Sequence, residues 1–403
     1  MLAPSPRRWV MLGVGTAAQT AGTSYLYGLP FLLPALRRAT DLALWELGLL
    51  VACPSLGMVL ALIGWGALAD RRGERLVAGL GLTLGAAFLA GAALSHGPAL
   101  FVLLTLAGAA GSAVYAASAR VVTGWFAPGE RGVAMGIRQT SQPLGVALAS
   151  AVLPVLAQAG GPRLALLATA GVSALAGVVT ALLLVDAPGR RTPRRVLAPA
   201  AVALTGWWHR SPTVWRIHGA SALLVVAQFV VGAFALDFLI TARGWAAGTA
   251  GPAIAGAQLV AAAARVLAGR WSDRSGSRLR PLRVIALGTA GVLGALAAAE
   301  AGDAPVVAPL LLVALVATVS WHGVAYAAVA DAVPVSWAGR ATSTQTVVQN
   351  VAATATPPLF GLAVTALGYA PGFTVAALFP LAAVAVLARL RESSGPGRAA
   401  SRT

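Results

Sequence analysis

The sequence has little charge, one cysteine and no lysine. Charged residues make up 10% of its 403 positions, whereas a typical soluble domain contains about 25% charged residues. Apolar residues make up 58%, and the mean hydropathy is +0.80. A single cysteine, Cys53, excludes an intramolecular disulfide and any metal site built from several cysteines. The composition therefore excludes an ordinary soluble domain and indicates an integral membrane protein.

Twelve apolar runs are long enough to cross a membrane, since a helix of about 20 residues spans a hydrocarbon core of about 30 Å. By residue number the runs are 9–36, 42–69, 76–94, 98–120, 133–159, 163–185, 217–241, 245–268, 284–300, 305–330, 341–367 and 371–390. The first run is too long for a signal peptide, and the alternation typical of a membrane barrel is absent. The sequence thus predicts an all-α membrane protein with twelve transmembrane helices.

All 29 basic residues are arginines, and the net charge is +17. If the N-terminus lies inside the cell, the outer connections hold only Arg37, Arg38, Arg163 and Arg243. Because positive residues concentrate on the cytoplasmic side, both termini are predicted to be cytoplasmic, in the inner membrane. Topology explains the charge, so we expect no nucleic-acid partner.

The chain contains an internal repeat. Gly66–Arg75 and Gly269–Arg278 follow the second and eighth runs, 203 residues apart, and share the pattern G-x-x-x-D-R-x-G-x-R. A second matching pair, Val114–Arg120 and Ala325–Asp331, ends the fourth and tenth runs. Two six-helix halves in parallel arrangement explain both pairs. The expected organisation is an N-terminal half over 1–186, a cytoplasmic linker over 187–214, a C-terminal half over 215–392 and a tail over 393–403.

These features resemble the major facilitator superfamily of transporters over nearly the whole chain. The segment after the second run is similar to the family signature G-x-L-A-D-R-x-G-R-[RK], with Glu74 replacing the first basic residue. Gln142–Gly145 is similar to part of the G-P-x-x-G stretch of antiporter members, with Gln142 where glycine is expected. The resemblance implies the major facilitator fold, a cavity lined by the first, fourth, seventh and tenth helices, and a cytoplasmic clasp between the halves.

The signature loops supply this predicted cytoplasmic gate. Gly66 and Gly269 are expected to let a neighbouring helix approach. Arg120 is expected to pair with Asp70 and Glu130, because carboxylates accept charged hydrogen bonds. Asp331 is expected to pair with one of three arginines, Arg274, Arg278 or Arg340. The predicted gate residues are Gly66, Asp70, Arg71, Gly73, Arg120, Glu130, Gly269, Asp273, Arg274, Gly276, Asp331 and Arg340.

Ionisable side chains inside spans are costly and are candidates for function. Arg138 lies roughly 8 Å inside the fifth run, with Gln142 one turn further on the same face. Its guanidinium can bind a carboxylate bidentately, or it can reach the membrane boundary or pair structurally. Arg265, four residues before Gly269, is interpreted as structural.

Two further ionisable residues are candidates for proton coupling, Asp237 and His322, and His322 is also a candidate for substrate contact. The alternative for Asp237 is a solvated or arginine-paired residue at the outer surface, and for His322 a packing role. The uncharged candidates for substrate binding, each of which can instead bond between helices, are Gln19, Tyr25, Tyr115, Gln228, Tyr326, Gln349 and Asn350.

The leading interpretation is a secondary active transporter of a small organic solute, working by alternating access. Arg138 favours uptake or exchange of a small organic anion, whereas the scarcity of charge in the helices suits export of a lipophilic compound. Without lysine there is no phosphate-binding P-loop, so ATP is not the direct energy source. A non-transporting sensor of the same fold is a further alternative.

A membrane enzyme is not expected. The four histidines are scattered along the chain, and no G-x-S-x-G nucleophile motif precedes a helix. We expect no cofactor and no metal site, because no His/Cys/carboxylate cluster with metal-ligand spacing occurs. The expected partners are the lipid bilayer, a small-molecule substrate and, in one version, a co-transported proton, with the chain as a monomer.

Overall fold

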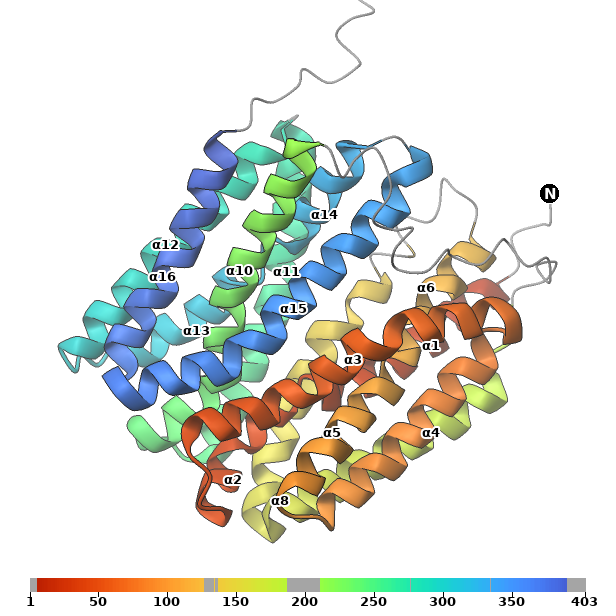
Figure 1. Ribbon diagram of the computed structural model, residues 1–403, viewed down its shortest axis with the longest axis horizontal. Helices are drawn as coiled ribbons and strands as arrows, with labels where there is room; N and C mark the ends of the chain where they lie inside the picture. The colour runs from red at the N-terminus through yellow and green to blue at the C-terminus, as the bar shows by residue number, and fades with distance from the viewer. Residues whose placement is uncertain are drawn as a thin grey trace, which may run out of the picture.

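The computed structural model describes residues 6–126, 134, 137–186, 211–275, 277–333 and 335–389, with the backbone alone at Asp70, Thr123, 335–340 and Ser343. Within these residues the chain consists of helices and their connections and contains no strand. The helices lie side by side in one bundle (Figure 1). The all-helical fold class predicted from the apolar runs is confirmed.

The first half of the bundle extends to the end of the sixth crossing. Its helices are α1 (Arg7–Leu26), η1 (Leu29–Leu32), α2 (Leu33–Ala39), α3 (Leu44–Arg72), α4 (Glu74–Ala93), α5 (Pro98–Gly111), α6 (Ala113–Trp125) and α8 (Ser141–Leu183). The first predicted run is broken after α1, because Pro30 and Pro34 begin η1 and α2 and lack the N–H group that would continue a helix. Long α8 holds two crossings, since Gly160 and Gly161 have non-helical backbone angles.

The second half repeats this arrangement. Its helices are α10 (Pro212–Asp237), the π-helical turn η3 (Phe238–Ala242), α11 (Ala247–Ser275), α12 (Leu279–Ala301), α13 (Val307–Ala317), α14 (His322–Asp331), α15 (Val335–Leu367) and α16 (Tyr369–Ala388). Helix α10 begins inside the range expected for the linker, while the expected tail, 393–403, lies outside the described residues. In Figure 1 these helices, green to blue, occupy one side of the molecule and the first half occupies the other.

The described helices account for twelve crossings. Ten helical stretches are long and apolar enough to span a membrane. One of them, Ile137–Leu183, reverses at Gly160–Gly161 and so supplies two crossings. The broken α1–η1–α2 segment supplies the remaining one.

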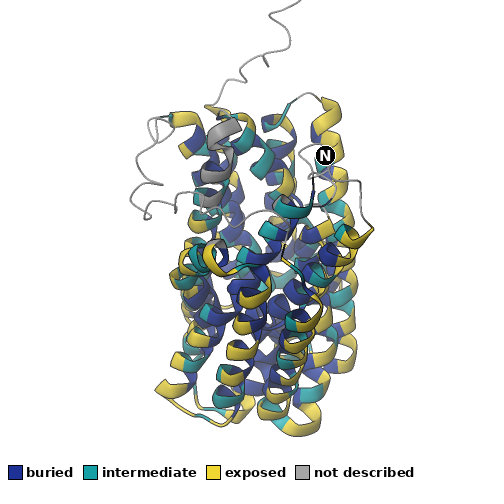
Figure 2. Ribbon diagram, turned by 90° about the vertical axis from the view of Figure 1, so that its right-hand side faces the viewer, coloured by how far each residue is buried: buried dark blue, intermediate teal, exposed yellow. Residues whose placement is uncertain are grey.

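The surface of the bundle is apolar, as a lipid environment requires. Figure 2 shows buried residues in the interior and exposed residues around the outside. Large apolar side chains such as Leu60, Leu175 and Leu182 are 65–72% exposed. Such side chains gain from contact with hydrocarbon rather than water, so the chain is an integral membrane protein.

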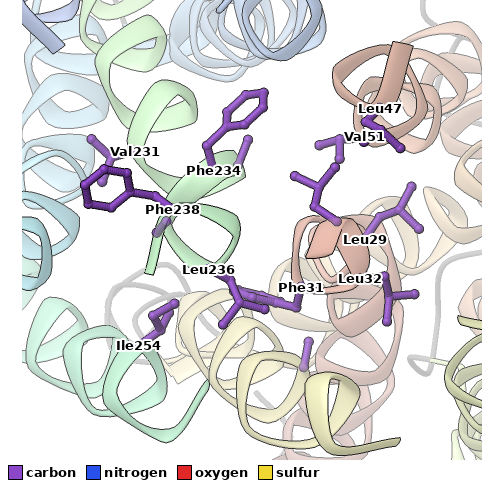
Figure 3. Packing of buried hydrophobic residues seen from close by; sticks show 14 of the residues in the cluster. Leu29, Phe31, Leu32, Leu47, Val51, Val231, Phe234, Leu236, Phe238 and Ile254 are labelled. Atoms are coloured by element: carbon purple, nitrogen blue, oxygen red, sulfur yellow. The ribbon is translucent and has the colours of Figure 1, made fainter. Parts of the chain in front are cut away.

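The two halves pack together at one end of the bundle. We call the end where α1 begins and α16 ends the terminal end, and the other the opposite end. Toward the opposite end, Phe31 of η1, Phe234 of α10 and Val51 of α3 belong to one buried apolar cluster that spans both halves (Figure 3). This cluster forms an apolar plug between the halves.

Glycine lets the backbones of α3 and α15 meet beside this plug. A Cβ atom at Gly361 would lie 2.7 Å from the Leu44 carbonyl oxygen, and one at Gly48 would meet the carbonyl group of Pro357. Both distances are too short for a real Cβ contact, so only glycine permits this approach. The contact therefore depends on two residues outside the signature loops.

We expect Gly48→Ala to destabilise the protein by about 1–3 kcal/mol, because the added methyl group overpacks the contact with α15. The matched control is Gly64→Ala on the same helix, where an added Cβ meets no atom of the described residues within 4 Å. Alanine is the better helix former, so this control should be neutral or stabilising. Thermal unfolding of purified protein in detergent measures both, and equal shifts would contradict the close contact.

Candidate functional site

A cavity of about 70 Å³ lies between the two halves. Its walls come from α1, η1, α3 and α8 of the first half and from α10, α11 and α13 of the second. Most of the lining is apolar. Seven lining residues have polar side chains: Tyr27, Ser55, Gln142, Gln228, Gln258, Arg265 and Thr318. Among the described residues that line the cavity, Arg265 alone carries a charge.

Arg265 joins the two halves across this cavity. Its Nε donates a hydrogen bond to the Val319 carbonyl oxygen at 3.1 Å, and its Nη1 donates to Oε1 of Gln142 at 3.3 Å. Gln142 belongs to α8 of the first half, whereas Arg265 belongs to α11 of the second. The sequence interpretation gave Arg265 a structural role. Arg265 lies ten residues before Ser275, the last residue of α11. This distance from the helix end indicates that its charge lies inside a span.

Arg138 lies in a buried polar network of the first half. Its Nε donates to the Ser118 hydroxyl at 2.9 Å, and its Nη2 donates to the Tyr115 carbonyl oxygen at 3.1 Å. The Ser118 hydroxyl in turn donates to Oε1 of Gln19 at 2.5 Å. The structure therefore brings together three predicted site residues, Gln19, Tyr115 and Arg138. None of the three is among the residues that line the cavity.

A second polar group comes from α14 and α15. The Tyr326 hydroxyl lies 2.9 Å from the Thr346 hydroxyl and donates to Oε1 of Gln349 at 3.1 Å. Asn350 donates to the Thr346 carbonyl oxygen at 2.8 Å. The hydrogen bonds of Tyr326 tie α14 to α15.

The remaining uncharged candidates differ in their surroundings. Gln228 lines the cavity, and its Oε1 is buried with no hydrogen-bond partner among the described residues. Tyr25 packs within the first half, where its hydroxyl donates to the Ala107 carbonyl oxygen at 3.3 Å. His322 stacks on Trp321, with ring centroids 4.0 Å apart.

Sequence reasoning missed a buried network in the second half. Nδ1 of His218 is hydrogen-bonded to Oε1 of Gln345, and Nε2 of Gln345 donates to the Ser221 hydroxyl at 2.5 Å. These bonds tie α10 to α15. Gln345 lies 203 residues after Gln142, the same displacement as the signature repeat, and that match could have identified it.

At the terminal end, Arg120 pairs with Glu74. The Nε of Arg120 lies 3.1 Å from Oε1 of Glu74, whose residue is 4% exposed. The expected partners were Asp70, whose side chain is not described, and Glu130, which lies outside the described residues. The observed partner is the residue that departs from the signature, and both residues belong to the first half.

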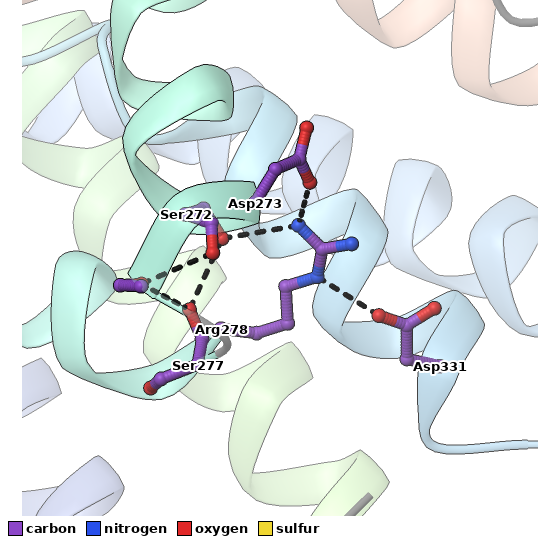
Figure 4. Close-up of polar contacts among 6 residues, drawn as sticks. Ser272, Asp273, Ser277, Arg278 and Asp331 are labelled. Carbon is purple, nitrogen blue, oxygen red and sulfur yellow. Dashed lines mark hydrogen bonds and ion pairs between the residues drawn. The ribbon is translucent and has the colours of Figure 1, made fainter. Parts of the chain in front are cut away.

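The matching cluster of the second half is centred on Arg278. Its Nε lies 2.8 Å from Oδ2 of Asp331, and its Nη1 lies 2.5 Å from Oδ1 of Asp273 and donates to the Ser272 hydroxyl (Figure 4). The expected contact of Asp331 with one of three arginines is therefore made by Arg278. Arg274 is exposed, and Gly276 and the Arg340 side chain lie outside the described residues.

The signature glycines divide into two kinds. Gly73 has φ +93° and lies between α3 and α4, so it provides the turn that was expected of it. Gly66 and Gly269 behave differently, since a Cβ atom added to either meets no described atom within 4 Å. The expectation that a neighbouring helix approaches these two glycines is wrong for this conformation. Arg71 is exposed beside this turn.

Asp237 lies at the opposite end, on the last residue of α10, and is 0% exposed. Its Oδ2 is 3.2 Å from Nη1 of Arg37 and accepts a hydrogen bond from the Tyr369 hydroxyl at 3.0 Å. The sequence left open a solvated or an arginine-paired Asp237. The structure shows the arginine pair, and the carboxylate is buried. Within the described residues no group of three or more potential metal ligands occurs.

Exchanging the charges of Glu74 and Arg120 tests the observed pair. Glu74→Arg and Arg120→Glu alone should each lower the thermal unfolding temperature, because each places like charges together. The double variant should recover stability, with a coupling free energy of about 0.5–3 kcal/mol. Arg72→Glu, on an exposed neighbour, is the control. A double variant no more stable than the worse single variant would refute the pairing.

Comparison with known proteins gives three informative matches. An uncharacterized MFS-type transporter of Mycobacterium tuberculosis is 38% identical over 378 residues, which cover 94% of this chain and 84% of that protein. A probable L-galactonate transporter of Escherichia coli is 31% identical over 122 residues, 30% of this chain and 27% of that protein. A solved bacterial homolog to the human lysosomal transporter Spinster, in an inward-facing and unoccupied conformation, shares the fold with a TM-score of 0.78 and 16% identity, covering 95% of this chain and 96% of that chain.

The family itself is shown by the match of the Major Facilitator Superfamily model to residues 12–353. This range extends from α1 to the middle of α15 and includes both signature loops. The repeat, the twelve crossings and the inter-half cavity agree with it. The chain therefore belongs to the major facilitator superfamily, a family of membrane transporters and not of enzymes.

Proposed function

We propose that this protein is a secondary active transporter that takes up or exchanges a small organic anion across the cytoplasmic membrane. The observation that carries the proposal is the guanidinium of Arg265 in the wall of the inter-half cavity. The substrate would bind there and be exposed to each side in turn as the halves move. Both termini would face the cytoplasm, which makes the terminal end the cytoplasmic end.

The charge of Arg265 favours an anion in the cavity. A charge in a protein interior is stabilised by a counter-charge or by several hydrogen bonds. The hydrogen bonds described for Arg265 run to two neutral acceptors, the Val319 carbonyl and the Gln142 amide. A guanidinium offers five N–H donors in a planar fork that fits a carboxylate. A carboxylate substrate would supply the negative charge that the described lining lacks.

The size of the cavity favours a small substrate. Its volume of about 70 Å³ is well below the roughly 300–1,000 Å³ of sites for drug-sized ligands. The name of the Escherichia coli relative, a probable L-galactonate transporter, also denotes a small carboxylate as cargo. Gln142, Gln228 and Gln258 would provide hydrogen bonds for the uncharged part of such a molecule.

Export of a lipophilic compound is the second candidate. The observation in its favour is the apolar character of most of the cavity wall, which includes Leu26, Phe31, Val51 and Phe229. An apolar compound would gain from burial against these side chains. It would leave the Arg265 charge without a counter-charge, and for this reason we favour the anion.

The proposed orientation predicts the location of two tags. A reporter fused after Thr403 should be cytoplasmic, and a tag in the 95–97 connection between α4 and α5 should be accessible from outside, because arginines concentrate at the terminal end. Labelling of intact cells with an impermeant reagent measures both. A C-terminal reporter on the outside would contradict the orientation.

Substitution of Arg265 tests the anion site. Arg265→Gln should weaken anion binding by about 1.5–3 kcal/mol, through the loss of a hydrogen bond to a charged group. Arg265→Lys should weaken it less, because the charge stays while the planar fork is lost. Arg138→Gln should have a smaller effect than Arg265→Gln, since Arg138 does not line the cavity. The measurement is calorimetric binding of L-galactonate and other small carboxylates to purified protein.

Arg270→Gln is the matched control, because Arg270 lies on the same helix and is exposed. It should bind every tested anion as the unmodified protein does. If Arg265→Gln binds anions with unchanged affinity, the anion site is wrong. Dye export can then be measured in energised vesicles that contain the unmodified protein or Arg265→Gln. Equal export of lipophilic dyes by both would support the second candidate.

A further inference from the structure

The ion pair between Arg37 and Asp237 connects the two halves at the opposite end. Arg37 belongs to α2 of the first half, and Asp237 ends α10 of the second. The Tyr369 hydroxyl, at the start of α16, donates to the same carboxylate oxygen, Oδ2. The Thr241 hydroxyl lies 3.4 Å from that oxygen and also accepts from Nη1 of Arg37 at 3.4 Å. We call these four residues the latch.

The latch differs from the other described ion pairs. Arg120–Glu74 lies within the first half, while the pairs of Arg243 with Glu300 and Asp303, and of Arg278 with Asp273 and Asp331, lie within the second. Only the Arg37–Asp237 pair crosses between the halves among the ion pairs described. It therefore adds an electrostatic contact to the apolar plug beside it.

The two partners of the pair sit in unlike environments. The Asp237 side chain is 0% exposed, while the Arg37 side chain is 46% exposed. Three polar groups surround Oδ2 of Asp237, but its Oδ1 is buried with no hydrogen-bond partner among the described residues. A buried oxygen without a donor is costly for an ionised carboxylate. Oδ1 is the position at which an added proton would remove that cost.

We propose that Asp237 is a proton-binding site that controls the latch. With Asp237 ionised, Arg37 holds the halves together at the opposite end. A proton from the aqueous phase at that end adds to Oδ1 and neutralises the carboxylate, so the ion pair is lost. Arg37, already half exposed, becomes solvated without a large desolvation cost, and the opposite end is free to open.

The other charged and titratable groups near this end are few. Helix α2 also carries Arg38, α16 contributes only Tyr369, and η1 and α13 contribute none. Arg243 follows η3 and is already paired with Glu300 and Asp303. Glu46, in the first turn of α3, accepts a hydrogen bond from the Ala43 N–H of its own helix start. Among the described ion pairs, Asp237 is the only carboxylate that joins the two halves. The proposal does not depend on the nature of the transported anion.

Spin labels across the opposite end provide the test, and they require no substrate. In a Cys53→Ala background, Ala39→Cys on α2 and Ala246→Cys before α11 place one label on each half at exposed positions. Double electron–electron resonance on protein in lipid nanodiscs then measures the distance at a series of pH values. We expect a short distance at neutral pH and a growing longer-distance population on acidification.

Three variants identify the group responsible. Asp237→Asn should raise the ratio of open to closed populations at neutral pH by about tenfold or more, as loss of one charged hydrogen bond implies, and should abolish the pH response. Arg37→Ala should also open this end, whereas Arg38→Ala, on the neighbouring exposed arginine, should behave as the unmodified protein. Tyr369→Phe removes one donor to the ionised carboxylate, so the opening transition should move to higher pH.

The proposal is overturned if Asp237→Asn keeps the pH response of the unmodified protein. It is equally overturned if Arg37→Ala and Asp237→Asn both keep the short distance at every pH. Should Asp237→Asn fail to fold, the Tyr369→Phe shift and the contrast between Arg37→Ala and Arg38→Ala decide the question. None of these outcomes bears on the Arg265 binding experiments, so failure of this inference and failure of the anion proposal can be told apart.

Discussion

A polar group inside a membrane-spanning bundle must find its partners within the protein, because lipid offers none. This constraint determines where the charged side chains of the two halves lie. Arg138 is surrounded by a hydroxyl and a carbonyl oxygen, and Asp237 by an arginine and two hydroxyl groups. The acceptors described for Arg265 are neutral as well, but Arg265 lines the inter-half cavity and Arg138 does not. Access to the cavity therefore separates the functional candidate Arg265 from Arg138.

The two ends of the bundle are built differently. At the opposite end an apolar cluster, the glycine contacts of α3 with α15 and the Arg37–Asp237 pair all run between the halves. At the terminal end the described ion pairs of Arg120 and Arg278 each stay within one half. The family resemblance implied a clasp between the halves at the terminal end. The described contacts instead connect the halves at the other end, as expected of a conformation that is closed there.

The sequence was sufficient to predict the crossings and the family. The length of each apolar run and the repeated signature can both be read from short stretches of sequence. The sequence was also sufficient to predict the contact of Asp331 with one of three arginines nearby in the repeat. It could not reveal that Asp237 pairs with Arg37, which lies 200 residues earlier, since only the folded bundle brings α2 to α10. Likewise, Gly48 and Gly361 are among the glycines that meet the backbone of the other half, whereas Gly66 and Gly269 meet no described atom, because the relative position of the halves decides which glycines lie at their contact.

A substrate can shift a conformational equilibrium only by its different affinity for the two states. The Arg265–Gln142 hydrogen bond offers a means for such a difference, because it joins a cationic group of one half to a neutral amide of the other inside the cavity. Under the proposed function, a carboxylate bound to Arg265 replaces this weak acceptor by a charged one and changes the contact between the halves. The latch lies in the same interface, toward the opposite end. Anion binding at the centre and proton binding at Asp237 would then act on one movement, and each would alter the affinity of the protein for the other.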